Sequence, residues 1–337
     1  MRSQFLWIGG YASPQQKGLI RCAFSPDTGF EALEAYDGLL NPSYLLEHPQ
    51  KPVLYTVEES GEGAVCAWSR EGGRLNFLGR VSTGGASPCH LSLSEDGKWL
   101  YCANYTGGSA ACIRLDDGGI PAERTDLKQH QGKGPNPQRQ EKAHAHCVYP
   151  YRGRIGVCDL GEDRIYLYEN EGGRLREKAC LQAPPGSGPR HLAAHLRNPD
   201  SLYCVSELSG EVFVWRETAP DRFELTQRIG TLPRGFGGEN TAAAIRFTDD
   251  GRWLLVSHRG ADGIAAMPVG TDGTLEAPVW SSCVRGPRDF LILGEYVLAA
   301  GQRDGEIRAY VLEEGKLRDT CFRMEAGEPV CIQKALR

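Results

Sequence analysis

The sequence has no apolar run long enough to cross a membrane and no excess of positive charge. Its 38 Lys and Arg are set against 43 Asp and Glu, which gives a net charge of -5 and a pI of about 6.0. Such a chain lacks the overall positive charge that is typical of proteins that bind nucleic acid or an anionic membrane surface. The first ten residues carry only a short apolar stretch and no cleavage site of the Ala-x-Ala type, so the expected location is the cytoplasm.

Several common motifs are also missing. None of the 12 Cys forms a C-x-x-C pair, and the chain contains neither G-x-x-x-x-G-K nor G-x-S-x-G. The phosphate-loop and serine-nucleophile signatures are therefore absent. Many of the Cys lie inside strand-like apolar runs, which predicts buried, reduced thiols; these are Cys66, Cys102, Cys112, Cys158 and Cys204.

The sequence is rich in turns and contains a repeat. It has 42 Gly and 20 Pro among 337 residues. Segments of the form Pro-x-x-apolar, or a degraded version of it, recur along the whole chain; these anchor segments are 42–45, 88–91, 145–148, 189–192, 242–245, 287–290 and 329–332. The spacing fits a four-stranded propeller blade, which cannot bury its own faces and must stack on neighbours. We expect an all-β, seven-bladed β-propeller of four-stranded blades that forms a single domain over residues 1–337.

A second strand is expected after each anchor except the last. The six runs are 53–57, 99–103, 154–158, 202–205, 253–257 and 296–300. The run 5–11 looks similar but has no anchor before it, so the N-terminal and C-terminal strands should share one blade and close the ring. Third strands are expected at 63–68, 164–168, 211–215 and 306–310, and hairpin turns of one kind at 71–75, 171–175, 272–275 and 314–317. Two long insertions, before residues 144 and 242, should belong to a binding surface.

The repeat also indicates where a site should lie. The first strand of a blade lines the central channel, so one register position of the anchors gathers around the axis. The second anchor positions hold Ser43, Cys89, His146, Arg190, Ala243, Arg288 and Val330, and the ends of the second strands hold Glu59, Tyr105, Asp159, Glu207, Arg259 and Gln302. Packing alone rarely gathers such charges, because an unpaired buried charge costs several kcal/mol. The set predicts a site for a small anion.

Some of these residues could have a purely structural role. Arg190 and Glu207 could be a structural ion pair. His144 and His146 would share one face of a strand and could bind a metal with Asp159 or Glu207, but the motif is weak and we expect no metal. His90, His191 and His195 are expected to be structural, although His191 could face the pocket.

Several motifs together resemble the lactonase family of seven-bladed propellers, which includes bacterial 6-phosphogluconolactonase and fungal 3-carboxy-cis,cis-muconate cyclase. The motifs, which run in order over essentially the whole chain, are Ile-Gly-Gly-Tyr at 8–11, Asn-Pro-Ser-Tyr-Leu at 41–45, Ala-Asn-Tyr-Thr-Gly-Gly-Ser at 103–109, Ala-His-Ala-His at 143–146, Gly-Pro-Arg-His-Leu at 188–192, Ser-Glu at 206–207 and Ser-His-Arg at 257–259. The family usually has Ser-Asn-Arg in the last motif, and a more polar segment than Ala242–Ala244.

The resemblance implies that His146, Arg190, Glu207 and Arg259 form the catalytic set. We further expect a set of substrate contacts, made up of Glu59, Asn104, His144, Asp159, His191 and Arg288. Lactone hydrolysis needs a base, a cation for the oxyanion and a proton donor. Either His146 or Glu207 could be the base, while Arg190 and Arg259 suit the oxyanion and a substrate phosphate or carboxylate.

The expected function is hydrolysis of 6-phosphogluconolactone to 6-phosphogluconate without a cofactor. One alternative is a muconate-type cyclase acting on a carboxylated diene. Another is a non-catalytic propeller that binds a ligand or a partner protein on its rim, although the chain has no Trp-Asp or Gly-His dipeptides of the WD40 type. The expected ligand is an anionic lactone or sugar acid; the sequence does not indicate an oligomeric state.

Overall fold

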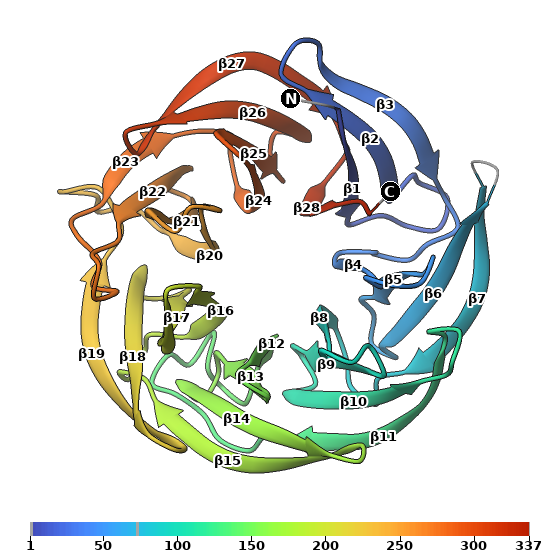
Figure 1. Ribbon diagram of the computed structural model, residues 1–337, viewed down its shortest axis with the longest axis horizontal. Helices are drawn as coiled ribbons and strands as arrows, with labels where there is room; N and C mark the ends of the chain where they lie inside the picture. The colour runs from blue at the N-terminus through green and yellow to red at the C-terminus, as the bar shows by residue number, and fades with distance from the viewer. Residues whose placement is uncertain (1–2, 72–73, 337) are drawn as a thin grey trace.

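The protein forms a ring of seven antiparallel four-stranded sheets (Figure 1). The computed structural model describes residues 3–71 and 74–336, and no helix occurs among them. The expected seven-bladed β-propeller is therefore confirmed. Blade 1 has the order β28-β1-β2-β3, and blades 2 to 7 follow in chain order from β4–β7 to β24–β27.

Two strands of each blade lie nearest the axis of the ring. The innermost strands are β28 (Pro329–Lys334), β4 (Leu45–Glu47), β8 (Pro88–Leu93), β12 (Ala145–Tyr151), β16 (Pro189–His195), β20 (Thr241–Phe247) and β24 (Pro287–Leu293). The second strands are β1 (Gln4–Gly10), β5 (Leu54–Glu58), β9 (Trp99–Asn104), β13 (Arg154–Asp159), β17 (Asn198–Ser206), β21 (Trp253–Arg259) and β25 (Tyr296–Gly301). Six of the seven anchor segments open an innermost strand, whereas segment 42–45 ends where the short β4 begins.

The other two strands of each blade lie farther out. The third strands are β2 (Leu19–Ser25), β6 (Ala64–Glu71), β10 (Ser109–Leu115), β14 (Arg164–Glu171), β18 (Glu211–Ala219), β22 (Gly263–Pro268) and β26 (Glu306–Glu313). The outermost are β3 (Gly29–Tyr36), β7 (Arg74–Ser82), β11 (Pro121–Gln129), β15 (Arg174–Gln182), β19 (Arg222–Gly230), β23 (Val279–Ser282) and β27 (Lys316–Glu325).

The two ends of the chain close the ring as expected. In blade 1, β28 pairs antiparallel with β1, and Ile332 lies opposite Ile8. Figure 1 shows the blue N-terminal and red C-terminal strands side by side. Because β1 is paired with β28 on one side and with β2 on the other, β1 itself has no open edge.

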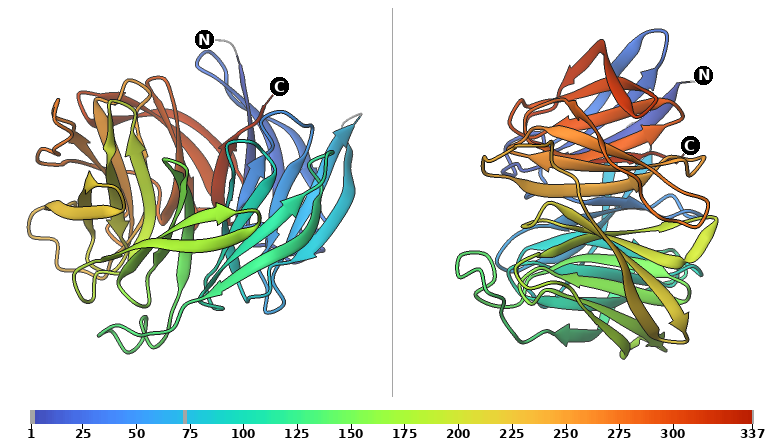
Figure 2. Two further views of the ribbon diagram at one scale, coloured as in Figure 1. Left: turned by 60° about the horizontal axis from the view of Figure 1, so that its bottom comes forward. Right: turned by 90° about the vertical axis from the view of Figure 1, so that its left-hand side faces the viewer.

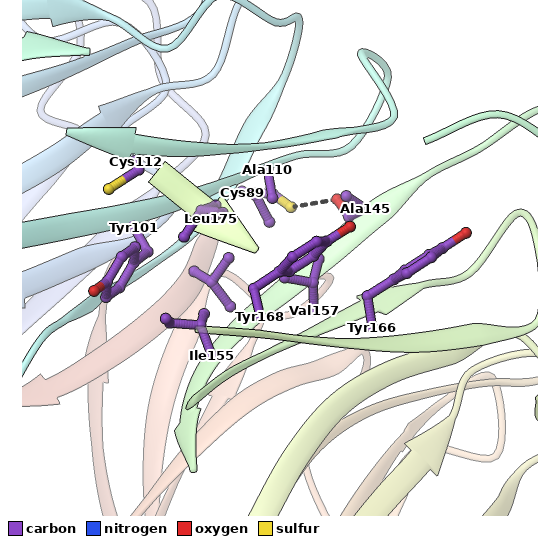
Figure 3. Packing of buried hydrophobic residues seen from close by; sticks show 12 residues of the cluster. Cys89, Tyr101, Ala110, Cys112, Ala145, Ile155, Val157, Tyr166, Tyr168 and Leu175 are labelled. Carbon is purple, nitrogen blue, oxygen red and sulfur yellow. Dashed lines mark hydrogen bonds between the residues drawn. The ribbon is translucent and has the colours of Figure 1, made fainter. Parts of the chain in front are cut away.

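The core lies between the blades. The inner strands are buried on both faces, because each sheet is sandwiched between its two neighbours. In β13, for example, every residue after Arg154 is buried. Seven apolar clusters lie between the blades, and each contains residues of two adjacent blades. The clusters follow one another around the whole ring. Figure 3 shows the cluster between blades 3 and 4, where Tyr101 and Cys112 of one blade face Ile155, Val157 and Tyr168 of the other.

The cysteines contribute to these clusters as reduced thiols. All 12 are free, and those expected to be buried are buried: Cys66, Cys102, Cys112, Cys158 and Cys204. Burial raises the pKa of Cys66 to about 12, which keeps that thiol protonated and unreactive.

The hairpin turns are not all of one kind. Gly172 and Gly173 both have positive φ (60° and 94°), as do Glu314 and Gly315 (46° and 78°), which is the pattern of a type I′ turn. Near Asp272 the loop is longer, and of its residues only Gly273 has a positive φ, 84°. Residues 72–73 of the first expected turn lie outside the described part of the chain.

A β-bulge falls at the same place in most blades. In blades 3, 4, 5, 7 and 1, the partner strand skips one residue of the innermost strand; the skipped residues are Cys89, His146, Arg190, Arg288 and Val330. Blade 6 has a similar shift between Ala242 and Ile245. A bulged residue is left out of the ladder, and its side chain can be re-aimed. These are second anchor positions, so in these blades the repeat places a bulged side chain beside the axis, whereas in blade 2 Ser43 precedes the short β4.

Candidate active site

The site lies at the end of the ring where the innermost strands begin. Because neighbouring strands are antiparallel, the start of each innermost strand lies beside the end of the second strand. Pro189 at the start of β16 is opposite Ser206 at the end of β17, which brings Arg190 next to Glu207. The same geometry brings the two polar sets predicted from the sequence to one end of the ring.

A small cavity at this end is lined by six of the seven second-position residues. Its wall includes Ser43, Cys89, His146, Arg190, Arg288 and Val330, together with Tyr11, Glu59 and His191. The volume is about 20 Å³, room for about one water molecule. The seventh position, Ala243, contributes its carbonyl oxygen, which accepts a hydrogen bond of 2.7 Å from Arg190 Nη1.

Glu207 binds three guanidinium groups. Its Oε2 lies 2.8 Å from Arg190 Nε and 3.0 Å from Arg259 Nη2, and its Oε1 accepts a 2.5 Å hydrogen bond from Arg139 Nη2. The Glu207 side chain is only 3% exposed. The predicted Arg190–Glu207 pair therefore exists, but as part of a four-residue network that includes Arg259 and a residue from the loop before β12.

The protonation states follow from this network. Burial alone would raise the pKa of Glu207, but Arg259, Arg190 and Arg139 hold it well below the ordinary value, so the carboxylate is ionised. Burial, with Arg190 next in importance, holds the pKa of His146 well below 6.5, so this imidazole is neutral at pH 7. Burial also raises the pKa of Cys89, whose Sγ lies 3.9 Å from His146 Nδ1, and this thiol is no nucleophile.

A second group of polar side chains completes the wall of the cavity. Arg288 Nη2 donates to Tyr11 OH at 3.0 Å, and Tyr11 OH donates to Glu59 Oε1 at 3.2 Å. Ser43 Oγ donates to Glu59 Oε2. Burial opposes the charge of Arg288, but Tyr11, Glu59 and Glu207 outweigh it and raise its pKa.

Positive charge is in excess here. Four guanidinium groups, of Arg139, Arg190, Arg259 and Arg288, face the carboxylates of Glu59 and Glu207. Asp289 also lines the cavity, but it is paired with Arg246 at 2.9 Å and leaves the excess unchanged. Although the whole chain carries a net charge of -5, this end of the ring suits an anion.

Sequence analysis missed two residues that take part in the site, Arg139 and Tyr11. Arg139 belongs to the first long insertion, which projects from one face of the ring in Figure 2. The insertion was expected at a binding surface, and Arg139 does reach the site, but no local pattern singled it out. Tyr11 follows β1 at the place that Glu59 and Tyr105 occupy in their blades, so the repeat could have identified it.

Three residues expected to contact substrate lie elsewhere. Asn104 is fully buried in blade 3 and donates its amide to Ser109 Oγ at 3.0 Å. Asp159 is fully buried, and its Oδ1 accepts backbone hydrogen bonds from His144 and Gly161. His144 turns to the Tyr105 carbonyl and to Glu141, both 3.1 Å away. Their side chains hold the backbone around the site instead of lining its cavity.

The predicted histidine pair does not form on one strand face. β12 begins at Ala145, so His144 precedes the strand, and the bulge at His146 breaks the alternation on which the prediction depended. Among the described residues, the one group with metal-ligand spacing consists of His130, Asp159 and Glu162, with ligand atoms within 4.8 Å. It includes neither His144 nor His146, and His130 Nδ1 already pairs with Asp159 Oδ2 at 2.7 Å.

The remaining histidines have different surroundings. His195 is structural as expected, with Nε2 2.9 Å from the Gly251 carbonyl oxygen and Nδ1 bonded to Asn198. His90 is buried against Tyr44 but not fully satisfied, because its Nδ1 has no partner. His191 lines the cavity, 5.3 Å from His146 between ring centroids, and burial holds its pKa well below 6.5.

A larger cavity, of about 400 Å³, shares Tyr44 and His191 with the wall of the small cavity and extends toward the opposite end of the ring. Its lining includes His195 and Phe247, the last residues of β16 and β20. Arg246 is the basic residue in that wall, and its Nη2 is already paired with Asp289. The charged network therefore marks the smaller cavity, not the larger one, as the candidate site.

A model of the family described as "Lactonase, 7-bladed beta-propeller" matches residues 5–334, nearly the whole ring. The chain belongs to this family. Its relatives include the 6-phosphogluconolactonase of Bacillus subtilis, 30% identical over 97% of both chains, and the 6-phosphogluconolactonase of Klebsiella pneumoniae, 30% identical over 90% of both.

Solved structures of lactonases have the same architecture. The periplasmic gluconolactonase of Pseudomonas aeruginosa superposes with a TM-score of 0.91 at 28% identity, covering 99% of this lactonase-family chain and all of its own. This agreement extends over every blade. No helix in the described part of the protein is long and apolar enough to span a membrane.

Proposed function

We propose that the protein is a lactone hydrolase that converts 6-phosphogluconolactone to 6-phosphogluconate in the pentose phosphate pathway. The observation that carries the proposal is one cavity walled by a neutral imidazole, His146, and two guanidinium groups, Arg190 and Arg288. The names of the Bacillus and Klebsiella relatives support the reaction type. A cytoplasmic location is part of the proposal, although the Pseudomonas neighbour is periplasmic.

In the proposed mechanism, His146 is the general base. The ionised Glu207 is a poor base, because three arginines stabilise its carboxylate. The neutral His146 takes a proton from a water molecule, and the hydroxide adds to the lactone carbonyl carbon. Arg190 and Arg288 stabilise the oxyanion that develops. When the tetrahedral intermediate collapses, the ring C–O bond breaks and the His146 imidazolium returns the proton to the leaving alkoxide.

Glu207 acts through the arginines. Its carboxylate accepts a hydrogen bond from Arg190 Nε, and the Ala243 carbonyl accepts one from Nη1. Arg190 Nη2 has no partner among the described residues and is the group that can bind the substrate. It also stabilises the His146 imidazolium, since the Glu207 charge favours the protonated form. The proposed steps use these side chains alone.

The test is a lactonase assay on freshly prepared 6-phosphogluconolactone, corrected for spontaneous hydrolysis. We expect the wild-type rate to exceed the background and His146→Gln to lose at least ~100-fold in kcat, because a positioned general base contributes about that much. His195→Gln, at the far end of the ring, is the matched control and should retain activity. Equal rates for wild type and His146→Gln would contradict the mechanism.

Binding of the product separates this proposal from a non-catalytic propeller. A ligand of the native state raises stability with the logarithm of its concentration. We expect 6-phosphogluconate to raise the melting temperature, and His146→Gln to retain that response while losing turnover. A protein that binds the acid but does not accelerate hydrolysis would be a binding module instead.

A further inference from the structure

The arginines around Glu207 differ in how far they reach toward solvent. The side chain of Arg190 is 2% exposed, that of Arg259 is 14% exposed and that of Arg139 is 35% exposed. Glu207 itself is 3% exposed and binds all three. The network therefore extends from the buried cavity outward, with Arg139 at its outer end.

The size of the cavity decides which part of a substrate can enter it. A space of about 20 Å³ accommodates a water molecule or a carbonyl oxygen. A phosphate, with four oxygens around phosphorus, needs several times that volume. The cavity as it stands in the structure has no room for a phosphate, so we place that group of the substrate toward Arg139 and the reacting carbonyl toward His146 and Arg190.

Arg139 has free donors at the outer position. Its Nη2 donates to Glu207 and to Tyr105 OH, the latter at 3.1 Å. Its Nε and Nη1 have no partner among the described residues. Each of these two groups can donate a charge-assisted hydrogen bond to an oxyanion outside the network.

The loop also holds Arg139 in place. The adjacent Gln140 is fully buried, and its Nε2 donates to Leu160 O at 2.9 Å and to Asp163 Oδ1 at 2.8 Å. The backbone N–H groups of Gln138 and Arg139 both donate to Asn136 Oδ1. A preorganised side chain loses less entropy when it binds a ligand.

We propose that Arg139 forms a subsite for the anionic group remote from the lactone ring, and that this group is a phosphate. The inference rests on the proposed lactonase function and adds the orientation of the substrate: carbonyl inward, phosphate outward against Arg139. Arg139 is then the residue that sets the preference for phosphorylated over unphosphorylated sugar lactones.

The test compares Arg139→Gln with wild type on 6-phosphogluconolactone and on gluconolactone. Loss of a charge-assisted hydrogen bond should lower kcat/KM for the phosphorylated substrate about 10- to 100-fold more than for the unphosphorylated one, mainly through KM. Arg139→Lys should restore part of the preference. Arg228→Gln, which removes a guanidinium on the outermost strand β19, is the control and should leave the ratio of the two kcat/KM values unchanged.

An equal loss on both lactones would overturn the proposal, because it would mean that Arg139 serves only to hold Glu207. Calorimetry with the products provides a readout that needs no turnover. Wild type should bind 6-phosphogluconate more tightly than gluconate, and Arg139→Gln should remove most of that difference. If wild type hydrolyses neither lactone but shows this difference, the proposed function fails and the subsite stands. If wild type binds the two acids equally, the subsite fails whatever the activity.

Discussion

At the residue scale, the molecule depends on a few buried charges, and Glu207, which pairs with three arginines, is one of them. Substituting Glu207→Gln leaves Arg190 almost fully buried without its counter-charge. We expect a loss of about 3–5 kcal/mol in the free energy of unfolding, because removing one partner of a buried ion pair strands the other. Urea denaturation measures this loss.

The matched control for Glu207 is a surface pair. Glu211→Gln breaks the contact with Arg228, which has the same Nε-to-carboxylate geometry but a 55% exposed guanidinium. Exposed ion pairs contribute at most about 1 kcal/mol, so the free energy of unfolding should change little. Similar losses for the two variants would mean that burial does not distinguish them.

His258 makes stability depend on pH. This fully buried residue bonds Thr231 Oγ1 at 2.8 Å, and burial with the neighbouring Arg259 lowers its pKa to about 3, against about 6.5 in an unfolded chain. Between these two pKa values only the unfolded state binds the proton. Stability contributed by the neutral imidazole is therefore present above pH 6.5 and is lost as the pH falls toward 3.

The variant His258→Asn should flatten this dependence. The free energy of unfolding should be measured in urea at pH 6, 5 and 4. We expect it to fall with decreasing pH less steeply in the variant than in wild type, by about 1.4 kcal/mol per pH unit. An unchanged slope would show that His258 binds protons equally in the folded and unfolded states.

At the scale of elements, the loop between β11 and β12 leads from the outermost strand of blade 3 to the innermost strand of blade 4, and its Arg139 reaches Glu207 of blade 5. Gln140 anchors the loop through Leu160 O and Asp163 Oδ1. Replacing Gln140 with Ala leaves both acceptors without that donor, so we expect about 2 kcal/mol of destabilisation and faster hydrogen exchange in residues 131–142. Gln138→Ala, where the side chain is exposed, should change neither quantity.

The blades show how far sequence reasoning can reach. The anchor segments predicted six of the residues that line the cavity, because the start of the innermost strand has the same place in every blade and short stretches of sequence encode it. This local rule fails where contacts are distant: Arg139 meets Glu207 across 68 positions of chain. It also failed at His144, since strand alternation holds only inside a strand and β12 starts one residue later.

Protonation could not be predicted from the sequence either. Glu207 and His146 were equal candidates for the base until the structure placed three guanidinium groups around the carboxylate. Two of these, from Arg139 and Arg259, come from outside blade 5. The pKa of a buried group is set by such neighbours, and no pattern around residue 207 identifies them.

At the scale of the whole molecule, the ring is held by the pairing of β28 with β1. Truncation after residue 328 removes β28 and exposes the inner edge of β1 together with the apolar cluster shared with blade 7. We expect the truncated protein to lose its cooperative unfolding transition in circular dichroism. The full chain should unfold in one transition, in keeping with a single domain over residues 1–337.

A circular permutant is the control for truncation. Ala335 N donates to Phe5 O at 2.8 Å, so a short linker can join the natural ends. New ends can be opened between Glu171 and Gly172, which are both exposed at a hairpin turn. This variant keeps every strand pair and should fold. If the permutant also fails to fold, the truncated chain fails because its ends have moved and not because β28 is missing, and the prediction is contradicted.

The bulges separate the chemistry of the site from the stability of the scaffold. A bulged residue has no cross-strand partner, so its side chain can be exchanged without rewriting the pairing of its neighbours. Val330 and Ala243 are the members of the set whose side chains carry no polar group, so they are the positions at which a new functional group can be added. The seven second anchor positions can therefore be varied independently of the fold. Natural or laboratory evolution can select a different substrate by exchanging one or two of these side chains.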